Sequence, residues 1–214
     1  TQELLGLPRG SRRVTGPPRP GPSAGTSVDL DGRQRKTLLV TTIAGHGLKH
    51  FLAAAFFVLL PEIKTSLALT NVEVGLMSTA RFVSGGIANL PAGFIADRFS
   101  RFRAEILGIS IALIGLFAFG LGLSQSFLFA TVSASLMVIA ISFWHPSAIA
   151  SLSRQFATRR GFAIALHGTG GSVGEAVGPA LAGIALGYVG WRALAQGSIV
   201  PALFAGIAIW ALLK

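Results

Sequence analysis

Three titratable side chains lie close together in the first apolar stretch of this sequence. His46, Lys49 and His50 are spaced at i, i+3 and i+4, so a helix places all three on one face. Histidine titrates near neutral pH and lysine attracts anions, so this face could bind an acidic ligand or pass a proton. His-x-x-x-His can also bind a metal, but no third ligand is near in sequence and Lys49 would repel a cation, so we expect none. A histidine bonded to a helix carbonyl is the structural alternative.

Two further charged residues, Arg81 and Glu175, interrupt other apolar stretches. Ionisable groups in a bilayer core cost roughly 2.5 to 3.5 kcal/mol each, which makes them candidates for function. At a rise of 1.5 Å per residue, Lys49, Arg81 and Glu175 come about 18, 22 and 20 Å from the cytoplasmic ends of their helices. We expect one shared substrate site near the midplane. Two cations against one anion predict an anionic substrate.

Proton coupling is assigned to His50 and Glu175, with His46 as a supporting member of the substrate site. A histidine can pass a proton to the carboxylate if the two helices meet. The alternative is a purely structural triad, in which Glu175 neutralises one of the two cations, Lys49 or Arg81.

The elements that must position these residues are apolar runs of about 20 to 25 residues, long enough to cross a hydrocarbon core of roughly 30 Å. The chain is 51% hydrophobic and 12% charged, with a mean hydropathy of +0.66, so it is too apolar for a soluble domain. The pattern predicts an all-α membrane protein whose six transmembrane helices lie at 37–60, 73–96, 104–124, 127–149, 162–186 and 193–213. Because the gaps are short, we expect consecutive helices to be antiparallel neighbours.

The basic residues are distributed unevenly between the gaps. Ten Lys and Arg residues fall on one side of the predicted bundle and two on the other, which places both ends in the cytoplasm and the protein in the plasma (inner) membrane. The net charge of +10 thus reflects topology, and we expect no nucleic-acid partner. Residues 1–36, rich in Pro and Arg, are expected to be a disordered cytoplasmic tail.

The gap after the second run, residues 93–103, has the sequence GFIADRFSRFR. It resembles the signature Gly-x-x-x-Asp-Arg/Lys-x-Gly-Arg/Lys-Arg/Lys of the major facilitator superfamily of transporters. Ser100 stands where that family has glycine, and Phe102 where it has a second basic residue. The resemblance implies a cytoplasmic gate controlled by the charged residues of this loop, Asp97, Arg98, Arg101 and Arg103. A plain positive-inside turn is the alternative.

The fifth run contains glycines at every fourth position, Gly170, Gly174 and Gly178, followed by Pro179. This spacing predicts a face on which another helix packs closely, and the proline favours a kink. The stretch also resembles the Gly-x-x-x-Gly-Pro motif of proton-driven exporters in the same superfamily, although Ala182 interrupts the usual glycine pair.

Two more histidines lie near predicted cytoplasmic helix ends. His145, in Trp144-His145-Pro146, and His167 come about 6 to 8 Å from those ends, so we expect them to line the inner gate. Trp144-His145-Pro146, with Arg154 beyond it, is similar to the fosmidomycin-resistance branch of the superfamily.

The resemblance covers 37–214 and implies a proton-coupled exporter of a small anionic compound that works by alternating access and needs no cofactor. Family members have twelve helices, so a second six-helix half is expected, either a missing C-terminal part or a dimer mate. An importer of organic anions and a non-transporting scaffold or pore remain alternatives.

Residues 170–174 match the Gly-x-Ser-x-Gly of hydrolases, but they lie inside an apolar helix and not at a strand-to-helix elbow, so we expect no enzyme.

Overall fold

The structure is a computed structural model that describes residues 30–214; most of the predicted basic tail lies outside these residues. The described part is helical, and it contains no strand. In chain order the elements are α1 (Gly32–Ser66), α2 (Asn71–Arg98), η1 (Ser100–Phe102), α3 (Arg103–Leu123), α4 (Phe127–Ser142), α5 (Trp144–Gln155), η2 (Ala157–Arg159), α6 (Arg160–Leu186), α7 (Trp191–Gly197) and α8 (Ile199–Leu213).

The first helix starts five residues before the predicted boundary at 37. Asp31 caps it, because its carboxylate accepts a hydrogen bond of 2.7 Å from the backbone N–H of Gln34, whose own side chain accepts from the backbone N–H of Asp31. Such a reciprocal cap satisfies two backbone donors that a helix end otherwise leaves unpaired. The boundary of the tail at residue 36 was therefore wrong, because residues 32–36 are helical.

Two of the six predicted runs are each divided into two helices. The break between α4 and α5 falls at Phe143, and the break between α7 and α8 falls at Ser198. In both cases a proline, Pro146 or Pro201, is the third residue of the second helix. A proline has no N–H and clashes with the carbonyl four residues earlier, which here belongs to the last residue of the preceding helix. The six predicted runs thus correspond to six rods, two of them broken by proline.

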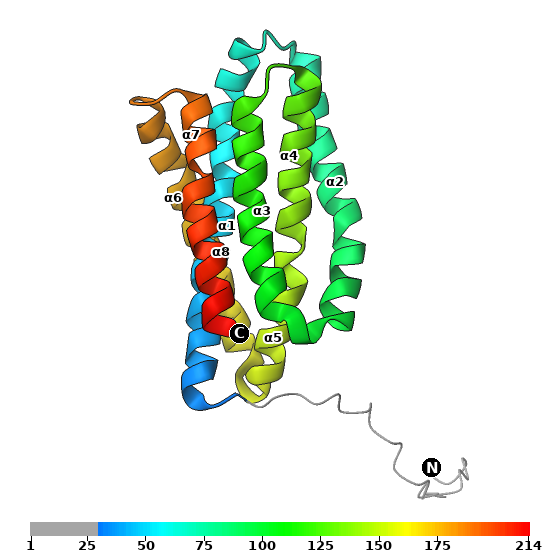
Figure 1. Ribbon diagram of the computed structural model, residues 1–214, viewed down its shortest axis with the longest axis vertical. Coiled ribbons are helices and arrows are strands. Elements are labelled where there is room, and N and C mark those ends of the chain that lie inside the picture. Colours follow the sequence, from blue (N-terminus) through cyan, green and yellow to red (C-terminus); the bar gives the residue numbers. More distant parts are fainter. Residues whose placement is uncertain (1–29) are drawn as a thin grey trace, which may run out of the picture.

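The rods pack in pairs that the chain order does not dictate. α1 packs mainly on α6, α3 on α8, and α2 on α4, and Figure 1 shows α6 and α2 at opposite edges of the bundle. α3 and α4 are neighbours as predicted, but α1 with α2 and α2 with α3 have almost no backbone contact, so the prediction that consecutive helices are neighbours was wrong for these two pairs. The glycine face of α6 instead brings the backbones of α1 and α6 into direct contact.

The outer surface of the bundle is suited to lipid. Four continuous segments are long and apolar enough to cross a membrane: Gly32–Ser66, Ser100–Leu123, Phe127–Gln155 and Trp191–Leu213. α2 and α6 are less apolar, but with 28 and 27 residues they have spanning length and belong to the same bundle. Large apolar side chains such as Phe82, Leu90 and Phe204 point outward and are exposed. The fold is therefore that of an all-α membrane protein.

The start of α1 and the end of α8 lie at the same end of the molecule (Figure 1). Leu38 of α1 and Leu152 of α5 pack there with Leu213 of α8. A cavity of about 1060 Å³ opens at this end and is lined by the cations Arg33, Arg101, Arg103, Arg154 and Lys214 and by the carboxylates Asp31 and Glu105. We call this the basic end; it gathers five of the ten cations that the sequence placed on one side.

Candidate functional site

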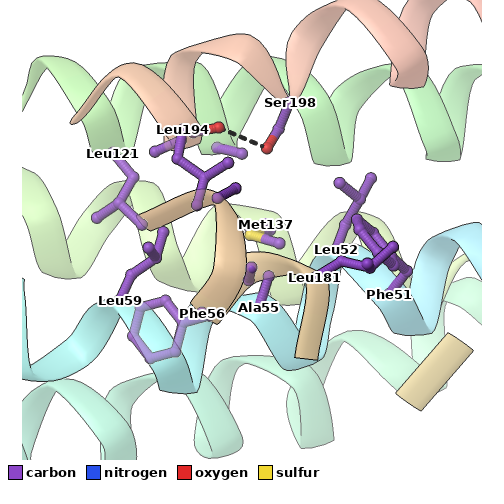
Figure 2. Close-up of a pocket in the computed structure, with 14 residues that line it drawn as sticks. Phe51, Leu52, Ala55, Phe56, Leu59, Leu121, Met137, Leu181, Leu194 and Ser198 are labelled. Atoms are coloured by element: carbon purple, nitrogen blue, oxygen red, sulfur yellow. Dashed lines mark hydrogen bonds between the residues drawn. The ribbon is translucent and has the colours of Figure 1, made fainter. Parts of the chain in front are cut away.

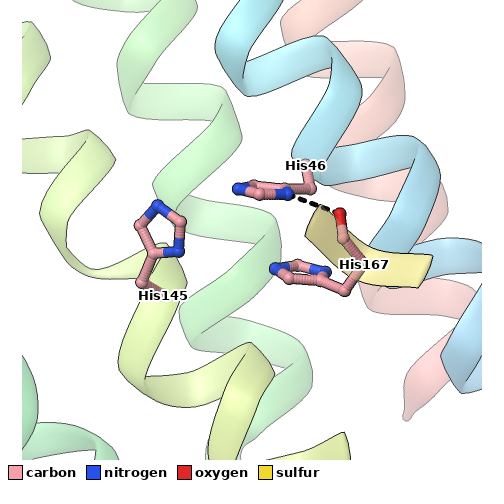
Figure 3. A group of neighbouring side chains, drawn as sticks. All are labelled: His46, His145 and His167. Carbon is pink, nitrogen blue, oxygen red and sulfur yellow. Dashed lines mark hydrogen bonds between the residues drawn. The ribbon is translucent and has the colours of Figure 1, made fainter. Parts of the chain in front are cut away.

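All four histidines of the protein meet in the interior, where α1, α5 and α6 come together. His46 and His50 come from α1, His145 from α5 and His167 from α6, and their neighbouring ring centroids lie 4.0 to 6.3 Å apart. Figure 3 shows His46 and His167 with their rings parallel and their outer nitrogens facing His145. We call these four residues the histidine cluster.

Lys49 is held by the histidine cluster. Its side chain is 0% exposed, and its ammonium Nζ lies 2.5 Å from Nε2 of His145. The ammonium donates and the imidazole nitrogen accepts, because a protonated lysine has no lone pair. An ammonium has three donors, and this is the one hydrogen bond that Lys49 makes within residues 30–214. Two donors are therefore left for an anion.

Backbone carbonyls fix the rings of His46 and His167. Nδ1 of His46 donates to the carbonyl of His167 at 2.7 Å, and Nδ1 of His167 donates to the carbonyl of Thr42 at 3.1 Å. A carbonyl can only accept, so the proton of each neutral ring must sit on Nδ1. The Nε2 atoms therefore carry the lone pairs. Nε2 of His167 is buried and has no hydrogen-bond partner in the described part of the chain.

His50 links His46 to Glu175. Since Nε2 of His46 carries a lone pair, Nε2 of His50 must donate to it across 3.1 Å. Nδ1 of a neutral His50 then has no proton, yet it faces the carboxylate of Glu175 at 3.7 Å. A proton on either partner removes this repulsion between a lone pair and a carboxylate. The Glu175 side chain is 68% exposed, so the pair connects the interior to the surface of this chain.

Three members of the histidine cluster approach the geometry of a metal site. His46, His145 and His167 each offer a nitrogen, and these atoms lie within 4.8 Å of one another. Nε2 of His145 is already bonded to the Lys49 ammonium, and Nε2 of His46 is bonded to His50. A bound cation would have to displace both partners and sit beside a buried positive charge. That no metal binds here remains our prediction.

The structure separates Arg81 from the other two charged residues predicted at one depth. Arg81 reaches from α2 to α1, where its guanidinium carbon lies 3.7 Å from the centre of the Phe56 ring. Phe56 follows Lys49 by seven residues, or about 10 Å along the helix. Glu175, by contrast, lies beside His50, the residue that follows Lys49 in α1. The prediction of a single layer of charge was thus wrong for Arg81, because helix ends do not start at one common height.

His145 and His167, predicted to line the inner gate, lie in the same cluster as Lys49 and His46. The distances of 6 to 8 Å were counted from predicted helix ends at 149 and 162, but α5 continues to Gln155 and α6 begins at Arg160, so both histidines lie deeper than predicted. Nothing in the sequence fixes how far one helix is displaced along its neighbour, so the contact between Lys49 and His145 could not be predicted. The even spacing of the glycines in α6 was the one available indication that His167 faces α1.

The predicted gate residues lie at the turn between α2 and α3. Arg98 and Arg101 lie over the rings of Phe99 and Phe102, at 5.6 and 4.6 Å from the ring centres. Asp97 is exposed and makes no ion pair with another described residue. Nε of Arg103 is buried and has no hydrogen-bond partner within residues 30–214. In this structure, therefore, Asp97 does not lock the turn to a neighbouring helix.

The glycine face of α6 rests directly on the backbone of α1. A Cβ atom on Gly170, Gly174 or Gly178 would collide with the backbone of Ile43, Gly47 or Phe51, respectively. Residue numbers increase in the same direction along both helices at this contact, so α1 and α6 are parallel. α6 continues past Pro179 to Leu186, so the Gly-x-Ser-x-Gly stretch lies within an unbroken helix and has no elbow.

A second cavity, of about 180 Å³, lies between α1, α3, α4, α6 and α7 (Figure 2). Its lining is apolar, with side chains such as Phe51, Leu59 and Met137. Its one polar side chain, Ser198, already donates its hydroxyl proton to the carbonyl of Leu194 at 3.0 Å. This cavity offers an anion nothing to bind, and the cations of the larger cavity lie at the basic end, where the gate is predicted. We therefore take the histidine cluster with Lys49 as the candidate site.

Known proteins of similar sequence are membrane proteins. The membrane sensor protein UhpC of Salmonella typhimurium is 29% identical over 83% of this chain and 40% of its own length. A cis,cis-muconate transport protein of Acinetobacter baylyi is 30% identical over 68% of this chain and 35% of its own. The chain therefore spans about 40% of the length of the curated relatives it matches. The fosmidomycin resistance protein of Escherichia coli, at 22% identity, gives the predicted branch only weak support.

The fold has a close match among solved structures. A bacterial homologue of the human lysosomal transporter Spinster, in an inward-facing and unoccupied conformation, superposes with a TM-score of 0.72 and 18% identity, over 86% of this chain and 44% of that one. The family model of the Major Facilitator Superfamily matches residues 42–214. Together with the six-rod bundle, this match confirms the predicted family: the chain belongs to the Major Facilitator Superfamily.

Proposed function

We propose that this chain is one six-helix half of a secondary transporter that carries a small organic anion by alternating access. The observation that supports this most directly is the fully buried Lys49, which keeps two donors free inside the histidine cluster. No carboxylate of the described residues lies within salt-bridge distance of this ammonium, and a buried ammonium attracts an anion more strongly than an exposed one, because little water screens it. The Acinetobacter relative, a cis,cis-muconate transport protein, agrees with an organic acid as substrate.

We infer that protons drive this transport through His50 and Glu175. The carboxylate and the ring nitrogen that faces it need one proton between them, and the neighbouring His46 continues the chain of hydrogen bonds inward. A proton that enters or leaves this pair changes the charge beside Lys49. Proton movement and anion binding are thereby coupled at one place.

A second six-helix bundle, from the same chain or another copy, completes the transport path in this proposal. The basic end faces the cytoplasm of the plasma (inner) membrane, since cations accumulate on that side. Asp97, Arg98, Arg101 and Arg103 control closure of the cytoplasmic gate. Export is the direction indicated by the exporter-like glycine stretch of α6, and import of an organic anion is the alternative.

Flux in proteoliposomes tests the proposal. Reconstituted protein that contains this chain and its second bundle should take up or release radiolabelled cis,cis-muconate with saturation, and an imposed pH gradient should change the rate. Lys49→Gln should abolish saturable flux. Lys64→Gln, in the last turn of α1 and far from the basic end, should not. Non-saturating flux would indicate a pore. Binding without flux would favour a sensing role, the role in the name of the Salmonella relative.

A further inference from the structure

Arg81 is a buried cation for which the described residues supply no counter-ion. Its side chain is 4% exposed, its Nε has no hydrogen-bond partner, and no carboxylate within residues 30–214 forms a salt bridge with it. Its guanidinium instead lies against the faces of Phe56 and Phe57, at 3.7 and 5.1 Å from the ring centres. A cation in an apolar interior is costly unless an anion joins it. Arg81 therefore has the properties of a second anion-binding group.

Arg81 and Lys49 are arranged along one face of α1. Phe56, whose ring lies against the Arg81 guanidinium, is seven residues from Lys49, so both side chains leave the same side of α1 at positions about 10 Å apart along its axis. Ala53 lies between them on this face, at i+4 from Lys49 and i−3 from Phe56. Its methyl group is the smallest apolar surface that a side chain can offer to a bound hydrocarbon segment.

We propose that the substrate is a dicarboxylate whose two ends are bound by Lys49 and Arg81 and whose carbon chain crosses Ala53; this inference rests on the proposed function. The ammonium has two free donors and the guanidinium five, enough for a carboxylate at each end. The two cations start from positions about two turns of α1 apart, so the two carboxylates must be separated by several carbons.

The test compares adipate, a six-carbon dicarboxylate, with its monoamide, which has the same length but one charge. Dissociation constants are measured by isothermal titration calorimetry on purified protein in detergent. The unmodified protein should bind adipate at least tenfold more tightly than the monoamide. Arg81→Gln should weaken adipate to the level of the monoamide and leave the monoamide within twofold of its original value. Arg81→Lys, which keeps a cation, should retain most of the preference for adipate.

Two controls separate this inference from the proposed function. Lys49→Gln should weaken both ligands, and Lys64→Gln should weaken neither. If neither ligand binds to the unmodified protein, the anion-carrier function itself is overturned. If both bind equally well, or if Arg81→Gln weakens the monoamide as much as adipate while the variant stays folded by circular dichroism, only the dicarboxylate inference is overturned.

Discussion

The ammonium of Lys49 in α1 donates to Nε2 of His145 in α5, 96 residues further along the chain, across 2.5 Å. The proposed anion site thus depends on two helices that are not consecutive. α5 begins at the break beside Phe143, so any movement of α5 relative to α1 changes the position of the ammonium.

His145→Ala should therefore weaken anion binding. Without its acceptor, the buried ammonium loses a charged hydrogen bond of about 1.5 to 3 kcal/mol and is no longer held in one position, so we expect roughly a tenfold higher dissociation constant. His145→Gln supplies a carbonyl acceptor and should restore part of the loss. Calorimetric titration with adipate measures both. An unchanged affinity in His145→Ala would show that the contact does not position Lys49.

Removal of either member of the His50 and Glu175 pair should uncouple transport from protons. In the proposed mechanism the two residues share one proton, so His50→Ala and Glu175→Gln should each abolish the response of flux to a pH gradient, and the double variant should be no worse than either one. Flux in proteoliposomes at equal and unequal pH is the measurement. Additive losses in the double variant would mean that the two residues act separately.

Gly174→Val should destabilise the fold, because its side chain would collide with the backbone of Gly47 in α1. Overpacking costs about 1 to 3 kcal/mol where neighbours can shift, and a backbone shifts little. The matched control is Gly168→Val in the same helix, where a Cβ atom meets nothing within 4 Å. Thermal unfolding in detergent should show a lower midpoint for Gly174→Val than for Gly168→Val. Equal midpoints would contradict the close packing of α1 on α6.

Asp97→Asn should leave stability nearly unchanged, within about 0.5 kcal/mol, because Asp97 is exposed and makes no ion pair with another described residue. If Asp97 acts in a second conformation of the gate, the same substitution should lower the flux severalfold. Thermal unfolding and proteoliposome flux separate the two effects. Normal flux would remove Asp97 from the gate.

The protein has no cysteine, so single cysteines can report the orientation directly. Ser66→Cys, at the end of α1 far from the basic end, should react in intact cells with a maleimide that cannot cross membranes. Ser100→Cys, between α2 and α3, should react only after the membrane is opened. The reverse pattern would place the basic end outside the cytoplasm and refute the predicted topology.

The sequence by itself determined that this is a bundle of six apolar rods with one basic end, because helix length, apolar composition and charge placement are local properties. It also determined the glycine face of α6, since a spacing of four residues puts Gly170, Gly174 and Gly178 on one side of any helix. The motif at 93–103 was sufficient to predict the family.

Only the tertiary structure decided which helices touch and at what height. Pairing of α1 with α6 brought His167 onto His46, and the break at Phe143 set His145 against Lys49. The relative height of two rods depends on how their side chains interlock over their whole length, not on the distance of a residue from its own helix end. For that reason Arg81, predicted level with Lys49, lies about two turns of α1 away from it, and His145 and His167, predicted at the gate, lie in the histidine cluster.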